Sequence, residues 1–252
     1  RHYASDCWIE GAVDYFYGNG NVLIENTTLY NVRYGSVITA ANHTTGTNWG
    51  YVFNNCTVDG INKVDPDKYG TESLDYQPSK GTAQTLGRPW QNNPITVFLN
   101  TKLKFDIDPA GWRDMGAVPA LYAEYNTTDK KGKAVDMSQR KTKYTINGTS
   151  YNYEGKTELS YSEYIKYTYE NIVNGSDGWN PKKFMEQLET PENVSLNGTT
   201  LSWDARYKAI CYLIFKADGS FEGQTTDTSF TVSDADATYT VKAANKYGTL
   251  SE

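Results

Sequence analysis

The chain has 252 residues and a formal net charge of −6, and 38% of its residues are hydrophobic and 21% charged. This composition is ordinary for a soluble globular protein, and the length accommodates one large domain and a small one. The longest basic clusters, Lys130-Lys131 and Lys182-Lys183, are too short for a nucleic-acid footprint. No apolar stretch approaches the roughly 20 residues that span a bilayer. We therefore expect neither a nucleic-acid partner nor a membrane span.

Cysteine and histidine are too few and too scattered for a metal centre. Cys7, Cys56 and Cys211 have no close spacing, so they form neither a zinc pattern nor a disulfide framework. Each lies in an apolar, strand-like context, and we expect three buried free thiols. The only histidines are His2 and His43. The sequence thus predicts no metal site and no cofactor.

Residues 1–105 contain a loose repeat of short strands and turns. In each copy Asp or Asn is followed by Cys or Thr, then by any residue, then by Ile, Leu or Val. The copies begin at Asp6, Asn26, Asn55 and Asn100. Such a repeat predicts a solenoid whose coils bury each other's faces, here a right-handed parallel β-helix with asparagines stacked in ladders at its turns. An antiparallel sandwich also uses short strands, so the repeat alone leaves both folds open.

Two polar insertions, 63–80 and 126–143, are expected to form surface loops. A helix is predicted to begin at Ser160, because Ser160 and Glu163 have capping-box spacing, and to end at Gly175. Apolar residues recur at helical spacing between them.

A second short helix is predicted from Asn180-Pro181. Both helices are expected to pack against the β-helix rather than to bind a partner.

The pattern changes after residue 188. Short strand runs follow at the spacing of a small antiparallel β-sandwich. Trp203 and Tyr239 stand where the fibronectin type III family keeps a core tryptophan and a corner tyrosine, so residues 189–252 resemble that family. We expect two domains, 1–188 and 189–252.

Two stretches carry candidate chemistry. In Gly11–Gly18, Asp14 lies among apolar and aromatic residues, where a charged carboxylate is costly without a partner; a turn aspartate that accepts from backbone amides is the alternative. In the second stretch, Leu86–Trp90, Arg88 offers a planar fork for a carboxylate and Trp90 a flat face for a sugar ring. A surface ion pair and a packed core aromatic are their alternatives.

Together the two stretches resemble the pectin methylesterase family, whose signatures are Gly-x-Val-Asp-Phe-Ile-Phe-Gly and Leu-Gly-Arg-Pro-Trp. The resemblance runs in the family's order over residues 1–188. It implies that Asp14 is the nucleophile, Arg88 its partner and Trp90 the residue that stacks on sugar. It also places three further residues in the substrate cleft, Tyr15, Met115 and Trp112, and core packing is the alternative for each of them.

The resemblance implies hydrolysis of the methyl esters of polygalacturonate, that is, demethylation of pectin (homogalacturonan) to pectate and methanol. A pectate lyase is an alternative, with Asp65, Asp67 and Glu72 as the acidic loop for calcium. A non-catalytic pectin-binding β-helix is another. The substrate implies a secreted, periplasmic or cell-surface protein, and the fibronectin-like tail implies a bacterium; we expect a monomer.

One family motif has no match in this chain. The family's Gln-Asp-Thr-Leu segment supplies the acid/base aspartate and an oxyanion-stabilising glutamine upstream of the nucleophile strand. We therefore expect the first coils of the β-helix to precede Arg1, and we expect these 252 residues alone to release no methanol.

Overall fold

The computed structural model describes residues 1–61 and 81–252. It divides into two compact units, Arg1–Trp179 and Asn180–Glu252. Residues 180–188, which the sequence analysis assigned to the first domain, lie in the second unit. The predicted loop 63–80 and the acidic residues Asp65, Asp67 and Glu72 lie outside the described residues. No helix in the described part of the chain is long and apolar enough to cross a membrane.

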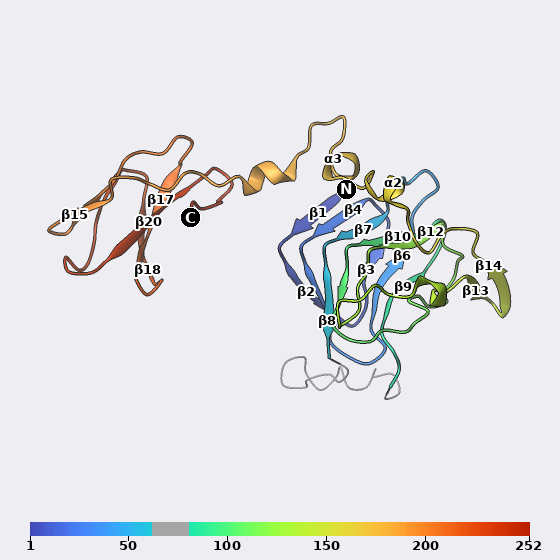
Figure 1. Ribbon diagram of the computed structural model, residues 1–252. Coiled ribbons are helices and arrows are strands. Elements are labelled where there is room, and N and C mark those ends of the chain that lie inside the picture. The colour runs from blue at the N-terminus through green and yellow to red at the C-terminus, as the bar shows by residue number, and fades with distance from the viewer. Residues whose placement is uncertain (62–80) are drawn as a thin grey trace. The chain divides into compact units, whose positions relative to one another are not determined.

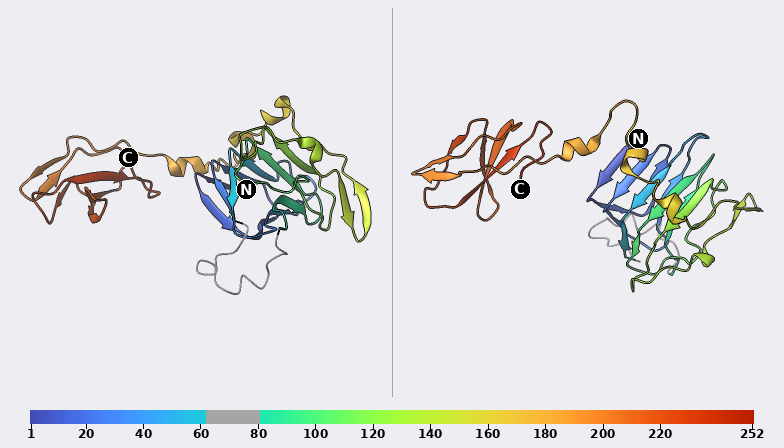
Figure 2. Two further views of the ribbon diagram at one scale, coloured as in Figure 1. Left: turned by 60° about the horizontal axis from the view of Figure 1, so that its bottom comes forward. Right: turned by 45° about the horizontal axis from the view of Figure 1, so that its top comes forward.

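The first unit is a parallel β-helix, as predicted. Its strands form three parallel sheets, and each of the first three coils adds one strand to every sheet (Figures 1 and 2). The fourth coil adds a strand to two of the sheets and the fifth to one. The first sheet contains β1 (His2–Ser5), β4 (Val22–Glu25), β7 (Tyr51–Asn54), β10 (Ile95–Leu99) and β12 (Leu121–Tyr125). The second contains β2 (Trp8–Gly11), β5 (Thr28–Asn31), β8 (Thr57–Gly60) and β11 (Lys102–Leu103). The third contains β3 (Val13–Gly18), β6 (Val37–Ala41) and β9 (Thr85–Pro89).

Asparagines form the corner between the first two sheets. Asn26, Asn55, Asn100 and Asn126 all have φ between 51° and 53°, a left-handed conformation that asparagine tolerates better than most residues. Their side chains hydrogen-bond along the axis, from Asn55 to Asn26 at 2.8 Å and from Asn126 to Asn100 at 3.0 Å. The predicted asparagine ladder is confirmed.

The residue after each corner turns into the core. Thr27, Cys56 and Thr101 are buried there. Cys7 occupies the same position in the first coil but is exposed, and Cys211 is partly exposed. The prediction of three buried thiols is therefore wrong for these two. Cys7 differs from Cys56 because no described coil stacks over its side of the first coil.

Aromatic rings fill the interior of the β-helix. Phe53 and Phe98 stack with ring centroids 4.5 Å apart, and Phe16 meets Phe53 edge to face at 5.0 Å. Alternate residues of the first sheet face outward and are covered by Tyr169, Ile172 and other residues of the segment after β12. The prediction that this segment packs on the β-helix is confirmed.

The predicted helix from Ser160 to Gly175 is two single turns instead, α2 (Tyr161–Tyr164) and α3 (Tyr169–Ile172). Ser160 and Glu163 do interact at the first N-terminus, where the backbone N–H of Ser160 donates to the Glu163 carboxylate at 2.8 Å. The break comes at Thr168, which is extended and whose hydroxyl accepts from the Asn171 backbone N–H. A second N-cap inside an apolar periodic segment thus restarts the helix.

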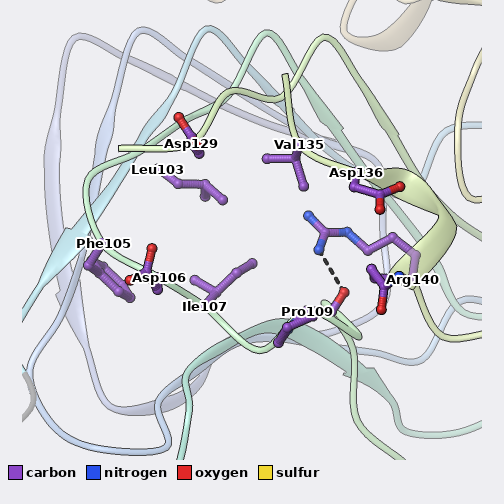
Figure 3. Close-up of a pocket in the computed structure, with 10 residues that line it drawn as sticks. Leu103, Phe105, Asp106, Ile107, Pro109, Asp129, Val135, Asp136 and Arg140 are labelled. Atoms are coloured by element: carbon purple, nitrogen blue, oxygen red, sulfur yellow. Dashed lines mark hydrogen bonds between the residues drawn. The ribbon is translucent and has the colours of Figure 1, made fainter. Parts of the chain in front are cut away.

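Past β12 the chain forms η2 (Met137–Gln139) and a hairpin of β13 (Lys143–Ile146) and β14 (Thr149–Asn152). The predicted surface loop 126–143 contains one buried charge, Arg140. Its guanidinium forms two hydrogen bonds to Glu124 of β12, at 2.6 and 3.1 Å, and donates to the Pro109 carbonyl at 2.9 Å (Figure 3). The Arg140 and Glu124 side chains are only 1% and 0% exposed, so this pair is a fully buried salt bridge.

His43 is buried and has a partner at each ring nitrogen. Nδ1 accepts from the Ile95 backbone N–H at 3.0 Å, and Nε2 lies 3.0 Å from the Gly20 carbonyl, to which it donates. This arrangement requires the neutral ring. Burial accordingly lowers the pKa of His43 from its ordinary value of 6.5.

Because the folded chain holds His43 neutral, the unfolded chain binds more protons as the pH falls below about 6.5. The stability from neutral His43 is therefore present above that pH and is lost as the pH falls toward the folded-state pKa. The free energy of unfolding therefore falls with decreasing pH, by at most about 1.4 kcal/mol per pH unit from His43. We expect His43→Gln to remove this contribution. Urea unfolding at pH 7.5 and 5.5 measures this; equal slopes in both proteins would contradict it.

The second unit begins with η3 (Pro181–Met185) and continues as two antiparallel sheets. One has the order β15 (Ser195–Asn197), β16 (Thr200–Ser202) and β19 (Ser229–Thr231); the other has β18 (Phe221–Thr225), β17 (Cys211–Lys216) and β20 (Tyr239–Ala244). Leu201 and Trp203 pack with Ile214 and Val241 in one core. The predicted small β-sandwich is confirmed, and η3 replaces the predicted second helix.

Candidate active site

Asp14 lies at an irregularity in β3. The pairing of β3 with β6 shifts between Val13 and Phe16, which is a β-bulge, and Asp14 has a φ of 53°. A bulge re-aims side chains and breaks the alternation of a strand. Here Tyr15 and Phe16 both pack against the core. The Asp14 carboxylate instead meets Arg88.

Arg88 reaches Asp14 across an intervening strand. The third sheet has the order β3-β6-β9, so about 10 Å separates the backbones that carry the two residues. Ala40 of β6 is the register partner of both Tyr17 and Arg88, and its methyl group leaves room for the long side chain to pass. The Arg88 Nε donates to both Asp14 oxygens, at 2.9 and 3.2 Å, and a terminal nitrogen also bonds to Oδ2.

This pair does not serve stability. The Arg88 and Asp14 side chains remain 28% and 19% exposed. A partly exposed pair is worth at most about 1 kcal/mol, because water competes for both charges. The two-nitrogen fork nevertheless fixes the carboxylate in one orientation. The carboxylate is thus aimed and still reachable, which a reacting group requires.

A buried polar chain supports the bulge from inside. The Tyr15 hydroxyl donates to Asn31 at 2.8 Å, and the Asn31 amide donates to Gln84 at 2.8 Å. Asn31 and Gln84 are 0% and 1% exposed. Burial raises the pKa of the Tyr15 phenol. Tyr15 is partly buried and anchors the strand that carries Asp14.

An aromatic pair stands beside the carboxylate and guanidinium. Trp90 is half-buried, and its ring centroid lies 6.0 Å from that of Tyr17, at an interplanar angle of 57°. Tyr17 is 70% exposed and follows Asp14 by three residues on β3. The sequence analysis named Trp90 and missed Tyr17. The missed signal is the second tyrosine of Asp-Tyr-Phe-Tyr, which the bulge places outside the core.

The other two predicted cleft residues have different fates. Met115 is half-buried, and the next residue, Gly116, donates its backbone N–H to the Pro89 carbonyl at 3.0 Å, so this segment borders Trp90. Trp112 is only 2% exposed and packs against Phe98 and Tyr122 in the core. A buried indole cannot stack on a sugar, so the placement of Trp112 in the cleft is corrected to a core role.

Arg113 brings a second guanidinium to the site. The sequence analysis did not name this residue. Its backbone N–H donates to Gly87 at 3.0 Å, which sets Arg113 beside Arg88 in the next coil. Burial, followed by the positive charge of Arg88, lowers the pKa of Arg113. Arg113 donates to the carbonyls of Gly35 and Ala83 and forms no salt bridge with any described residue. It supplies positive charge beside Asp14, in an otherwise acidic protein.

The first unit also contains a hollow that none of the predicted site residues lines. It has a volume of about 300 Å³ and an apolar lining that includes Leu103, Ile107 and Val135 (Figure 3). Its aspartates have local partners; for example, the Asp129 carboxylate accepts from two backbone N–H groups. Within residues 1–61 and 81–252, no three or more His, Cys, Asp or Glu residues gather as metal ligands would.

The chain is similar to known proteins over most of its length. A family model described as Pectinesterase matches residues 1–175. A probable pectinesterase A of Neosartorya fischeri is 37% identical over 153 residues, which cover 59% of this chain and 41% of that protein. A probable pectinesterase/pectinesterase inhibitor 41 of Arabidopsis thaliana is 26% identical over 188 residues, 71% of this chain and 28% of that protein.

Among solved structures, a pectin methylesterase of Aspergillus niger is 25% identical with a TM-score of 0.47, covering 71% of this chain and 50% of that one. The chain therefore spans less than half the length of the curated relatives named here. Because the family model covers more than half of the 252 residues, including Asp14, Arg88 and Trp90, the chain belongs to the pectinesterase family.

Proposed function

We propose that the chain carries the nucleophile half of a carboxylic ester hydrolase that removes methyl groups from methyl-esterified polygalacturonate. The observation that supports this most directly is the Asp14 carboxylate, fixed by the Arg88 fork and still partly exposed. Membership of the pectinesterase family supplies the substrate class.

In this proposal an Asp14 oxygen attacks the C6 carbonyl carbon of a methyl galacturonate. The tetrahedral intermediate collapses as the C6–OCH₃ bond breaks, and the methoxide takes a proton and leaves as methanol. Water then attacks the acyl-aspartate anhydride, which releases the galacturonate carboxylate and restores Asp14. Arg88 holds the attacking oxygen in place, which lowers the entropic part of the barrier. Among the described residues the Asp14 carboxylate hydrogen-bonds only to Arg88.

The aromatic pair supplies the sugar platform in this proposal. Trp90 and Tyr17 present ring faces next to the carboxylate, and Met115 borders them. Arg113 adds a positive charge that suits the free carboxylates of a partly demethylated chain. The proposed substrate-binding set is thus Trp90, Tyr17, Met115 and Arg113, and Tyr15 acts by supporting the strand.

A product assay tests this proposal against its two alternatives. Methyl-esterified polygalacturonate and, in parallel, demethylated polygalacturonate are incubated with the 252 residues together with whatever residues adjoin them in the natural protein. An esterase releases methanol in proportion to new carboxylates, whereas a lyase releases none and leaves unsaturated chain ends only when calcium is present. Binding without either product would support the non-catalytic alternative and overturn the proposal.

Further proposals concern the rest of the molecule. We infer that the second unit is of the fibronectin type III kind, because the Tyr239 hydroxyl donates to the Asp234 carbonyl at 2.9 Å, as a corner tyrosine does. Its two three-stranded sheets support the same assignment.

A pectin substrate lies outside cells, so we propose a secreted, periplasmic or cell-surface monomer. A bacterial origin rests on the fibronectin-like unit alone.

A further inference from the structure

We propose that the second unit has its own binding site for polygalacturonate, separate from the Asp14 site. A hollow of about 570 Å³ lies wholly within this unit. Three lysines and three apolar residues line most of it: Lys183, Lys208, Lys246, Leu188, Ile210 and Tyr247. The inference rests on the proposed function, since polygalacturonate is the product of the proposed reaction.

The charge of the hollow is not neutralised by the chain. Lys183, Lys208 and Lys246 form no salt bridge with any residue in the described part of the chain. Glu186 is the only acidic residue among those that line the hollow. Three ammonium groups around one concave surface repel one another, and a ligand with several carboxylates relieves that repulsion. The hollow therefore favours binding of an anion, even though the chain as a whole has a net charge of −6.

An aromatic ring is held ready beside these charges. Tyr247 is 48% exposed, meets Phe184 edge to face with centroids 4.6 Å apart, and has the Lys246 ammonium 4.8 Å from its ring centroid. The Asn245 side chain fixes this loop, because it donates to the Glu186 carbonyl at 2.7 Å and accepts from the Tyr247 N–H at 2.9 Å. A fixed, exposed ring next to a cation suits a sugar that carries a carboxylate.

The backbone at Lys208 is strained in a way that favours the same site. Lys208 has a φ of 66°, the only non-glycine residue other than Asp or Asn in the described chain with a positive φ. Such a conformation costs free energy and concentrates at functional positions. Here the left-handed turn that Arg206 and Ala209 close, at 3.1 Å, carries Lys208 into the lining of the hollow.

The site is longer than one sugar. A second hollow of about 250 Å³ shares Glu186, Leu188 and Lys208 with the first and adds Gln187, Glu189, Arg206 and Tyr207. Arg206 is paired with Glu192 at 3.1 Å. Tyr207 is 86% exposed, with the Lys208 ammonium 5.5 Å from its ring centroid. Both hollows place a lysine beside an exposed tyrosine, Lys246 beside Tyr247 and Lys208 beside Tyr207. Glu186 and Glu189 balance the two cations of the second hollow, so the first hollow supplies the positive charge and the second extends the surface along which a polymer can lie.

The test measures binding of demethylated oligogalacturonate to the whole chain by calorimetry. An Arg88→Ala/Trp90→Ala background removes the first-unit site from the measurement. In this background, Lys183→Gln/Lys208→Gln/Lys246→Gln is expected to weaken binding at least tenfold and to flatten its dependence on salt. Tyr247→Ala, which keeps every charge, is expected to weaken it about fivefold.

The matched control removes three exposed lysines of the first unit, Lys102→Gln/Lys104→Gln/Lys143→Gln, and gives the same net charge. Unchanged affinity in the hollow's triple variant, or an equal loss in the control, would overturn the site. Equal binding of polyglutamate would also overturn it, since that polymer has the charge without the sugar. Methanol release by the triple variant in the natural background reports on the proposed function separately and is expected to be unchanged.

Discussion

In the natural protein, in which further residues adjoin these 252, exchange of Asp14 for asparagine is expected to lower kcat/KM for methanol release by about four to six orders of magnitude, as loss of a nucleophile does in other hydrolases. Asparagine keeps the size of the side chain and an oxygen for the Arg88 fork, but it has no anionic oxygen to attack the ester. Asp14 and Arg88 are partly exposed, so the variant should fold with little loss of stability.

Asp6→Asn is the matched control. Asp6 lies in the same coil, has a φ of 55° against 53° for Asp14, and is exposed. It undergoes the same chemical change in the same backbone conformation, and its methanol release is expected to stay at the level of the unmodified protein. Comparable rates for Asp14→Asn and Asp6→Asn would remove Asp14 from the chemistry.

Arg88 belongs to the same experiment, because its effect depends on Asp14. Arg88→Lys keeps the positive charge but loses the planar fork, and a loss of roughly a hundredfold in kcat is expected from misaimed attack. In the Asp14→Asn background the same change is expected to cost almost nothing further, since residues that act as a unit are not additive. Multiplicative losses in the double variant would instead indicate independent roles.

Glu124→Gln is expected to destabilise the first unit by about 3 to 5 kcal/mol. The change leaves the Arg140 guanidinium buried and positively charged beside a neutral amide, without water to solvate it. Both side chains are at most 1% exposed, and among the described residues the Arg140 guanidinium donates to one other acceptor, the Pro109 carbonyl. The Arg140 side chain also packs on Gly111, where a Cβ would lie 2.8 Å from it, so the site has little freedom to rearrange.

Chemical unfolding followed by fluorescence measures this effect. The control is Asp106→Asn, which breaks the exposed pair with Lys130 and is expected to cost no more than about 1 kcal/mol. Replacing both partners, Glu124→Leu with Arg140→Met, is expected to recover much of the loss because no charge remains buried. A cost below about 1 kcal/mol for Glu124→Gln would show that water reaches Arg140.

The sequence by itself determined the fold class and the central contact of the site. The Asp/Asn-then-Cys/Thr repeat indicated stacked coils, because a left-handed corner and an inward small residue are local requirements that recur from coil to coil, and the family resemblance decided between a β-helix and a sandwich. The two signature stretches predicted that Asp14 and Arg88 meet, 74 positions apart in the chain, and they do. Trp203 of the second unit, which the strand spacing predicted to be a core residue, packs with Ile214 and Val241.

The tertiary structure alone decided which way the aromatic side chains point and how far each apolar segment stays regular. Tyr15 and Tyr17 share a face in an ideal strand, but the bulge at Asp14 sends one into the Asn31–Gln84 network and the other out to Trp90. Trp112 and Arg113 are sequence neighbours, yet one is core and the other borders Arg88. Such orientations depend on the register between coils, a long-range quantity that no local pattern encodes. The burial of Arg140 is also set by a tertiary contact. Arg140 is buried because it pairs with Glu124, which lies on β12, 16 positions earlier in the chain.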